Sequence, residues 1–233
     1  MSRAMRLRAL EFNGEEGDAP YDAVPASSFN HNFTIAPSIQ RPPEGPSLSR
    51  MLLDATERGN ARPACRSLFV RDNQLIFGFR PARGRYFEYG KIDLPSRPGW
   101  YNIAVSVNIN RLEMQFYIDG LPVEMVNFRT VFLREDARKA GALAPINSIS
   151  IGIGRTSSSF SAPLAYVQGK IGEVRLWNHI RSEANIRSNH RRALMSDAIG
   201  LEGLWRFTTG EGNLVESLVP EESSAARINN PTW

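Results

Sequence analysis

Alternating apolar and polar positions are the clearest pattern in this sequence. In residues 102–109 and again in 113–118, every second side chain is apolar, so these side chains share one face of an extended chain: Ile103, Val105, Val107, Ile109, Met114, Phe116 and Ile118. This period of two predicts half-buried β-strands. The Asp119-Gly120 pair that follows favours the left-handed dihedrals of a two-residue hairpin turn. We therefore expect residues 121–126 to return antiparallel.

Similar short segments recur along the whole chain. Strands are predicted at 9–12, 33–39, 67–70, 74–80, 86–92, 149–153, 170–177 and 204–207. The proline-rich stretch 36–49 predicts a surface loop, and the charged stretch 134–145 an insertion. One helix is expected at 183–195, capped by Ser182, with Ile186 and Leu194 facing the core. Many short strands with a single helix predict one all-β domain, residues 1–233, built as a two-sheet antiparallel sandwich.

Several motifs, in order, resemble one known family. WYNIAV at 100–105 is similar to its W-H-H-V-A-V strand, and FYIDG at 116–120 to its L-Y-V-D-G hairpin. GKIGEVRLWN at 169–178 resembles G-x-I-D-E-V-R-I-W-N, and GLWRF at 203–207 resembles the strand near that family's C-terminus. The chain thus resembles the laminin-G-like and pentraxin-like branch of the concanavalin A-like lectin/glucanase superfamily. The resemblance implies a jelly-roll sandwich with one short helix in its C-terminal half.

Catalysis is not expected. The superfamily's glucanases carry E-x-D-x-x-E on one strand, which places two carboxylates within reach of a glycosidic bond, and the chain has no such triplet. His31, His179 and His190 lie beside no nucleophile motif. Glu173 and Arg175 stand two apart on one strand face, where a structural pairing is predicted. Trp177 and Trp205 are expected to be core or edge-covering aromatics.

Calcium is the ion that the resemblance implies. Hard cations take several oxygen ligands, and the acidic loop that includes Asp18 and Asp22 supplies carboxylates. The family's acidic residue in I-D-E-V is Gly172 here, and its D-x-S-G segment reads ESLV at 216–219. We predict that calcium is absent or weakly held at Asp18 and Asp22, with a solvated acidic loop as the alternative, and we expect no other cofactor.

Charge and cysteine content narrow the classes of partner. The formal net charge of +4 comes from arginines spread over the chain, without a defined basic patch, so nucleic-acid binding is not expected. Cys65 is the only cysteine, which excludes an intrachain disulfide and a four-thiolate metal site. No apolar run approaches the length of a membrane span, and no secretory signal is apparent. Synthesis in the cytoplasm is expected, with a virion or particle surface as a candidate location.

Two functional hypotheses follow. The first is a non-catalytic binding or display module that recognises glycans or protein surfaces through rim loops at 14–23, 81–85 and 156–163. The second is a purely structural decoration or fibre subunit of a phage or similar particle. Residues 1–5 offer two methionines and one arginine suited to docking, so we hypothesise that residues 1–6 contact another chain in a homo- or hetero-oligomeric assembly.

Overall fold

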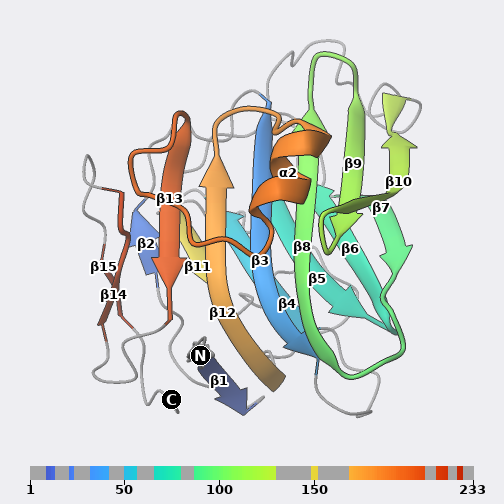
Figure 1. Cartoon of the computed structure of the whole chain (residues 1–233). Coiled ribbons are helices and arrows are strands. Elements are labelled where there is room, and N and C mark those ends of the chain that lie inside the picture. The colour runs from blue at the N-terminus through green and yellow to red at the C-terminus, as the bar shows by residue number, and fades with distance from the viewer. Residues whose placement is uncertain are drawn as a thin grey trace, which may run out of the picture.

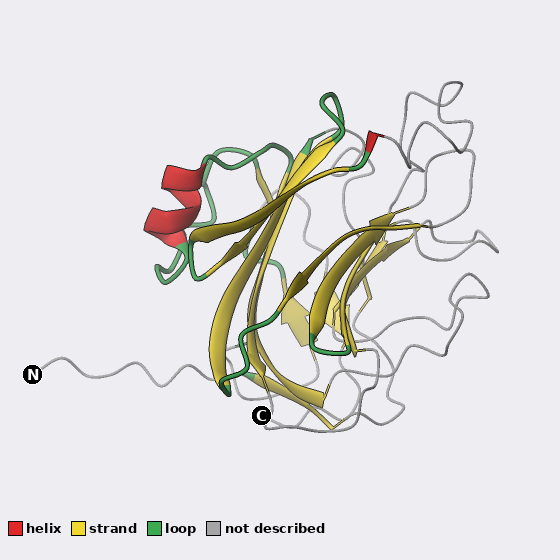
Figure 2. Ribbon diagram, turned by 90° about the vertical axis from the view of Figure 1, so that its right-hand side faces the viewer, coloured by secondary structure: helices red, strands yellow, loops and turns green. Residues whose placement is uncertain are grey.

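Two antiparallel β-sheets pack face to face (Figure 1). The computed structural model describes residues 9–13, 21–23, 32–41, 50–56, 66–79, 87–129, 148–151, 168–207, 214–219 and 225–227. Seen edge-on, the strands form two layers, and the single described helix lies outside one of them (Figure 2). The all-β, two-sheet jelly-roll sandwich that the sequence predicts is confirmed.

The larger sheet has seven strands. In order across the sheet these are β1 (Leu10–Asn13), β12 (Gln168–Trp177), β3 (Phe33–Arg41), β8 (Gly99–Asn108), β9 (Glu113–Ile118) and β10 (Leu121–Asn127). The seventh, β13 (Leu201–Arg206), pairs with the later half of β12, while β1 pairs with the earlier half.

The second sheet has six strands. Their order is β2 (Tyr21–Ala23), β11 (Ser148–Ile151), β4 (Arg50–Thr56), β5 (Arg66–Arg71), β6 (Gln74–Phe79) and β7 (Phe87–Asp93). A separate ribbon joins β14 (Leu214–Glu216) to β15 (Ala225–Arg227). The short strands β2 and β4 were not predicted from the sequence.

The hydrophobic core lies between the two sheets. Of the seven side chains that the alternation places on one face, Ile103, Val105, Val107, Met114 and Phe116 are buried, and Ile109 and Ile118 are half-buried against them. Aromatic rings join the layers: Phe33 of β3 lies 6.0 Å from Phe77 of β6, centroid to centroid. The predicted burial is therefore confirmed, and it fixes which face of each strand looks outward.

The predicted hairpin turn is also confirmed. Asp119 and Gly120 have φ of 50° and 79°, the left-handed values that a two-residue turn with the strand twist requires. Asp119 also ties the turn to β8, because its carboxylate accepts a hydrogen bond of 3.0 Å from the Asn102 amide. The turn is thereby anchored beside the outer face of the seven-stranded sheet.

The predicted loop at 36–49 is wrong at its beginning. β3 runs through Pro37 to Arg41, in the middle of the sheet. Proline has no N–H to give to a ladder, and the β3–β8 pairing is interrupted at Ala36 and Pro37. The neighbouring strand β12 has a register shift between Ile171 and Glu173. The sheet accommodates the proline with a local irregularity, which lies at the site described below.

The helix begins where predicted and ends early. α2 (Glu183–Asn189) is capped by Ser182, whose hydroxyl accepts a hydrogen bond of 3.2 Å from the Asn185 amide. The expected extension to residue 195 is wrong, because the chain leaves the helix after Asn189. Ile186 is buried as predicted, but on the outer face of the sheet, and Leu194 packs there from the following segment. In the described part of the chain, no helix has the length and apolar character needed to cross a membrane.

Candidate functional site

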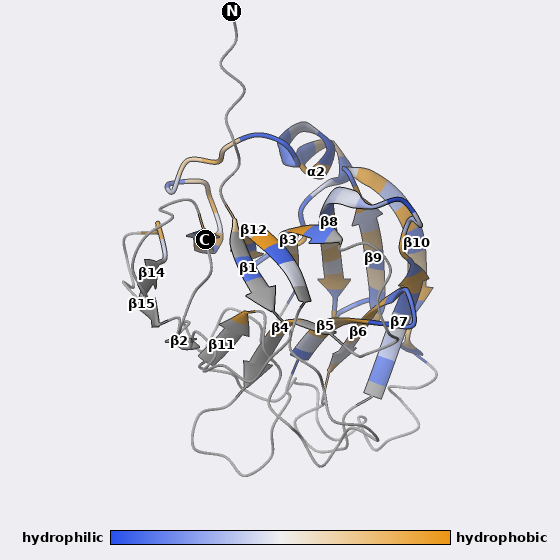
Figure 3. Cartoon of the chain, turned by 90° about the horizontal axis from the view of Figure 1, so that it is seen from below, coloured by the Kyte–Doolittle hydropathy of each residue, from blue (hydrophilic) through white to orange (hydrophobic). Residues whose placement is uncertain are grey.

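The outer face of the seven-stranded sheet carries a cover, formed by residues 182–200. Viewed from below, α2 lies on the side of this sheet that faces away from the six-stranded sheet (Figure 3). Two small apolar clusters attach the cover. Ile186 packs on Ala104 and Tyr117. Leu194 and Ala198 pack on a second cluster, formed by Trp177, Leu201 and Leu204.

A charged network joins the two attachments. The Glu173 carboxylate accepts hydrogen bonds from the guanidinium groups of Arg175 and of Arg206, the latter at 2.5 Å. Only 13% of the Glu173 side chain and 10% of the Arg175 side chain is exposed, so the charges are largely removed from water. The pairing that the sequence predicts for Glu173 and Arg175 is confirmed.

The same guanidinium groups hold the end of the helix. Arg175 donates to the carbonyl oxygens of Asn189 at 2.8 Å and Arg192 at 2.7 Å. Arg206 donates to the carbonyl of Leu194 at 2.6 Å. Carbonyls at and after a helix C-terminus have no partner within the helix and carry partial negative charge. The sheet supplies cations at this point, which accounts for the chain leaving the helix after Asn189.

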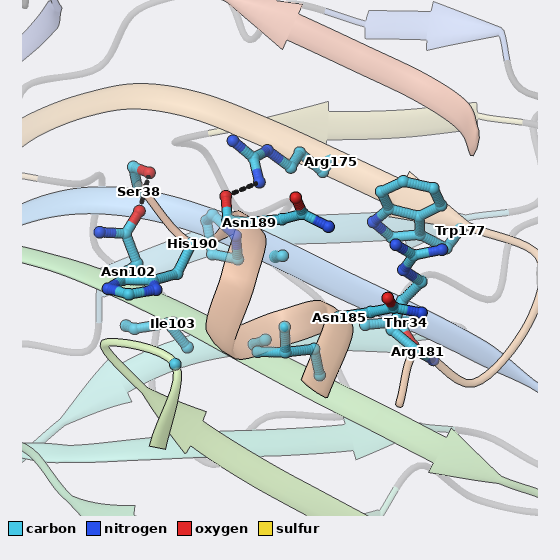
Figure 4. Close-up of a pocket in the computed structure, with 15 residues that line it drawn as sticks. Thr34, Ser38, Asn102, Ile103, Arg175, Trp177, Arg181, Asn185, Asn189 and His190 are labelled. Carbon is cyan, nitrogen blue, oxygen red and sulfur yellow. Dashed lines mark hydrogen bonds between the residues drawn. The ribbon is translucent and has the colours of Figure 1, made fainter. Parts of the chain in front are cut away.

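A crevice remains between the cover and the sheet. It encloses about 30 Å³ and is bounded by β3, β8 and β12 below and by α2 above (Figure 4). Its polar lining comprises Thr34, Ser38, Asn102, Arg175, Arg181, Asn185, Asn189 and His190. The ladder interruption at Ala36 and Pro37 lies in its floor. The crevice thus opens where the proline breaks the regular sheet.

One end of the crevice is built around Trp177. The guanidinium of Arg181 lies 4.0 Å from the centre of the indole ring, and the His179 ring meets the indole edge-on at 5.9 Å. Thr34 holds this segment in place: its hydroxyl donates to the His179 carbonyl at 2.9 Å and accepts from the Arg181 amide at 3.0 Å. Arg181 is thereby stacked on an aromatic face at the mouth of the crevice (Figure 4).

Burial changes the acid–base properties of this end. Burial lowers the pKa of His179, and the positive charge of Arg181 lowers it further. The pKa of Arg181 is lowered by burial and then by the charge of Arg175. The Arg181 guanidinium lies 3.4 Å from Nε2 of His179. A neutral imidazole accepts at that nitrogen, which agrees with the lowered pKa of His179.

A second indole, that of Trp100, lies next to Gly172 and is not among the residues that line the crevice. A Cβ atom added to Gly172 would lie 3.2 Å from the indole ring of Trp100 and 4.0 Å from Cβ of Ser38. The half-buried indole therefore reaches across β3 and rests where β12 has no side chain. Beside it, the Ser38 hydroxyl donates to the Asn102 side-chain oxygen at 2.7 Å. Gly172 stands where the family pattern has an acidic residue, and here it leaves room for an aromatic ring.

The hairpin turn closes the crevice against α2. A Cβ atom on Gly120 would lie 2.8 Å from Nδ1 of His190 and 2.9 Å from Cα of Arg187. Gly120 is required for two reasons: its φ is positive, and a side chain would collide with α2. The helix and the turn therefore form one wall.

The crevice is lined mainly by hydrogen-bonding side chains and by one indole. Side-chain amides and hydroxyls both donate and accept, and the Trp177 indole lines the crevice with them. No Asp or Glu occurs among the residues that line the crevice. Within the described ranges, no three His, Cys, Asp or Glu side chains are grouped so as to hold a metal ion. Such a surface is suited to binding a polyhydroxylated ligand.

Most of the sites predicted from the sequence fall outside the described residues. Asp18 is outside the described residues, as are the loop residues 14–20, 81–85 and 156–163 and the docking segment 1–6. Asp22 lies in β2, opposite Ile149, and its side chain is outside the description. Weak or absent calcium at Asp18 and Asp22 therefore stays a prediction.

The sequence did not identify the crevice. Its residues come from β3, β8, β12 and α2, which are far apart along the chain. Trp177 and Arg175 were noted, but as structural residues, and both do have such a role. One feature of the sequence could have indicated this site. Arg181 follows Trp177 by four residues, at the point where a strand leads into a helix.

No protein-family model matches the sequence, and no curated protein matches it. Among solved structures, a protein of Bacteroides ovatus ATCC 8483 to which carbohydrate binding is attributed has a TM-score of 0.62 at 16% identity, over 99% of this chain. This chain spans 60% of that protein's length. A heptameric SAP-like pentraxin from Limulus polyphemus has a TM-score of 0.54 at 10% identity, with 98% of both chains covered.

A third similar structure is the binding domain of botulinum neurotoxin DC in complex with SialylT. It has a TM-score of 0.50 at 9% identity, and the match covers 79% of this chain and 50% of that one. At these identities the likeness concerns the fold alone. The chain thus has the same jelly-roll sandwich fold as these proteins.

Proposed function

We propose that this chain is a non-catalytic module that binds saccharides on the outer face of its seven-stranded sheet, at the crevice beside α2. The observation that carries the proposal is the combination of Ser38 and Asn102, which line the crevice, with the Trp100 indole, which lies next to Gly172 outside the lining. A sugar ring has hydroxyl groups for hydrogen bonding and an apolar face that packs on aromatic rings. The carbohydrate binding attributed to the similar Bacteroides ovatus protein is consistent with this function.

The test is binding of the purified chain to a glycan array, followed by calorimetry on the best ligand. Trp100→Ala should weaken binding on the order of tenfold, or about 1.4 kcal/mol. Trp100→Phe, which keeps an aromatic face, should lose less. Leu121→Ala, at a site on β10 that is 56% exposed and outside the crevice lining, is the matched control and should bind as the native chain does. Absence of binding to every glycan, or equal affinity in Trp100→Ala, would contradict the proposal.

The absence of catalysis is part of the proposal. Glu173, the acidic residue nearest in sequence to the crevice strand residue Arg175, is already bonded to two guanidinium groups. Both of its oxygens are thus occupied by hydrogen bonds within the protein. Glycans incubated with the chain should be recovered unhydrolysed. Hydrolysis that is lost when one acidic residue is replaced would show an enzyme instead.

Two further hypotheses remain as proposals. Glycans or protein surfaces are expected to contact the rim loops as well, and residues 1–6 are expected to contact another chain in an assembly. A structural subunit of a particle would associate without any glycan ligand. Analytical ultracentrifugation of the chain, with and without residues 1–6, tests the assembly: a monomer in both cases would exclude association through this segment.

A further inference from the structure

The crevice carries positive charge without an acidic residue in its lining. Arg175 and Arg181 both line it. The network below it places two guanidinium groups, those of Arg175 and Arg206, on the single carboxylate of Glu173, so the network itself keeps a net positive charge. In a site partly screened from water, such charge acts over a longer range than it does at an open surface.

Arg181 is the cation that this arrangement leaves available. Among the described residues its guanidinium contacts an indole and an imidazole but no carboxylate. It is half-buried, and both burial and the neighbouring Arg175 lower its pKa, which means that its charge is held at a cost. An anion placed beside it would offset that cost. A guanidinium can bind a carboxylate or sulfate through two parallel hydrogen bonds.

The size of the crevice limits what can enter it. A cavity of about 30 Å³ holds one or two water molecules, not a sugar ring. A carboxylate or sulfate substituent is of the size that such waters occupy. The side-chain amides of Asn185 and Asn189, for which the described residues provide no hydrogen-bond partner, line the same space and can donate to an anion.

We propose that the crevice binds the anionic substituent of an acidic saccharide, with Arg181 as its principal ligand, while the sugar ring lies outside the crevice. This inference rests on the proposed saccharide binding and adds the class of saccharide. In either of two cases the group that enters the crevice is an oxyanion with a single negative charge. A carboxylate, as in a uronic acid, and a sulfate ester are its two sources.

The experiment compares matched pairs of glycans on an array that differ only in one carboxylate or one sulfate group. Uronic acid oligomers are paired with their methyl esters, and sulfated oligomers with their unsulfated counterparts. The best acidic ligand and its neutral partner are then measured by calorimetry against native chain, Arg181→Gln and Arg181→Lys. Arg191→Gln is the matched control, because it removes the same charge from an exposed position outside the crevice lining.

The acidic member of a pair should bind on the order of tenfold more tightly, and more weakly as salt is raised. Arg181→Gln should remove that preference, so that the acidic and neutral members then bind with similar affinity. Arg181→Lys should keep part of it, and Arg191→Gln all of it. The carboxylate and sulfate pairs show which source is preferred.

Equal binding of acidic and neutral members, or an equal loss for both in Arg181→Gln, would overturn the inference and leave saccharide binding intact. Equal loss in Arg191→Gln would overturn it too, because general surface charge would then suffice. Failure of every glycan to bind would overturn the proposed function and this inference together.

Discussion

Glu173 is the residue on which the attachment of the cover depends. Its carboxylate is the acceptor for two arginines, and those arginines donate to three carbonyls, one at the end of α2 and two in the segment that follows. The Glu173 carboxylate therefore orients both arginines that bind the end of α2 and the segment after it. Removing one member of a buried charge network leaves the others without compensation, which costs more than the network contributes when intact.

Glu173→Gln should lower the free energy of unfolding by about 2–4 kcal/mol, because two largely buried guanidinium groups lose their counter-charge. Urea denaturation followed by circular dichroism measures the change. The matched control is Glu183→Gln, which breaks an exposed pair with Arg187 and should cost less than about 0.5 kcal/mol. Equal effects of the two variants would show that the network adds no stability.

At the scale of elements, α2 matters because it forms a wall of the candidate site. The helix has seven residues, too few to be stable alone, so it persists through its cap, its apolar contact at Ile186 and the guanidinium groups at its end. Each of these acts on a different part of the helix. The wall of the crevice is therefore sensitive to a change at either end of α2.

Ser182→Ala should destabilise the chain by about 1 kcal/mol, because the Asn185 amide loses the hydroxyl that caps the helix. Ser188→Ala is the matched control. Ser188 is exposed and inside the helix, where alanine is the better helix former, so its effect should stay within about 0.5 kcal/mol. A thermal unfolding series of both variants separates the two outcomes, and the prediction fails if Ser188→Ala is the more destabilising.

The sequence predicted correctly those elements whose geometry is specified by neighbouring residues. β8, β9 and the turn into β10 follow from period-two alternation and from Asp119-Gly120, which specify geometry without help from distant residues. The strand at 33–39 was predicted through Pro37, but the overlapping proline-rich stretch 36–49 was predicted as a loop, so the continuation of β3 to Arg41 was missed; its pairing with β8 is interrupted at Ala36 and Pro37. The end of α2 depends on arginines of β12 and β13. The crevice, made by four segments, depends entirely on such distant contacts.

At the scale of the whole molecule, the two sheets share one core. Phe77 of β6 lies against Phe33 of β3, in the opposite sheet. Phe79 of β6 lies 5.2 Å, ring centre to ring centre, from Phe128, which follows β10. If one sheet unfolded alone, the rings of the other sheet that pack against it would be exposed to water. The prediction of one domain over residues 1–233 therefore implies that both sheets unfold together.

Phe77→Ala tests this coupling. Phe77 is fully buried in the six-stranded sheet, and its loss should cost about 3–5 kcal/mol through lost burial and a cavity. Three of the four tryptophans, Trp100, Trp177 and Trp205, lie in the seven-stranded sheet, so tryptophan fluorescence reports chiefly on the sheet that was not changed. If the sandwich unfolds as one unit, the fluorescence transition shifts to lower urea together with the circular dichroism transition.

The control is Leu121→Ala, at an exposed position, which should shift neither transition. If Phe77→Ala fails to fold, Phe77→Leu gives the same comparison with a smaller shift. A circular dichroism transition that moves while the fluorescence transition stays in place would show that the sheets unfold separately, and the single-domain prediction would be wrong.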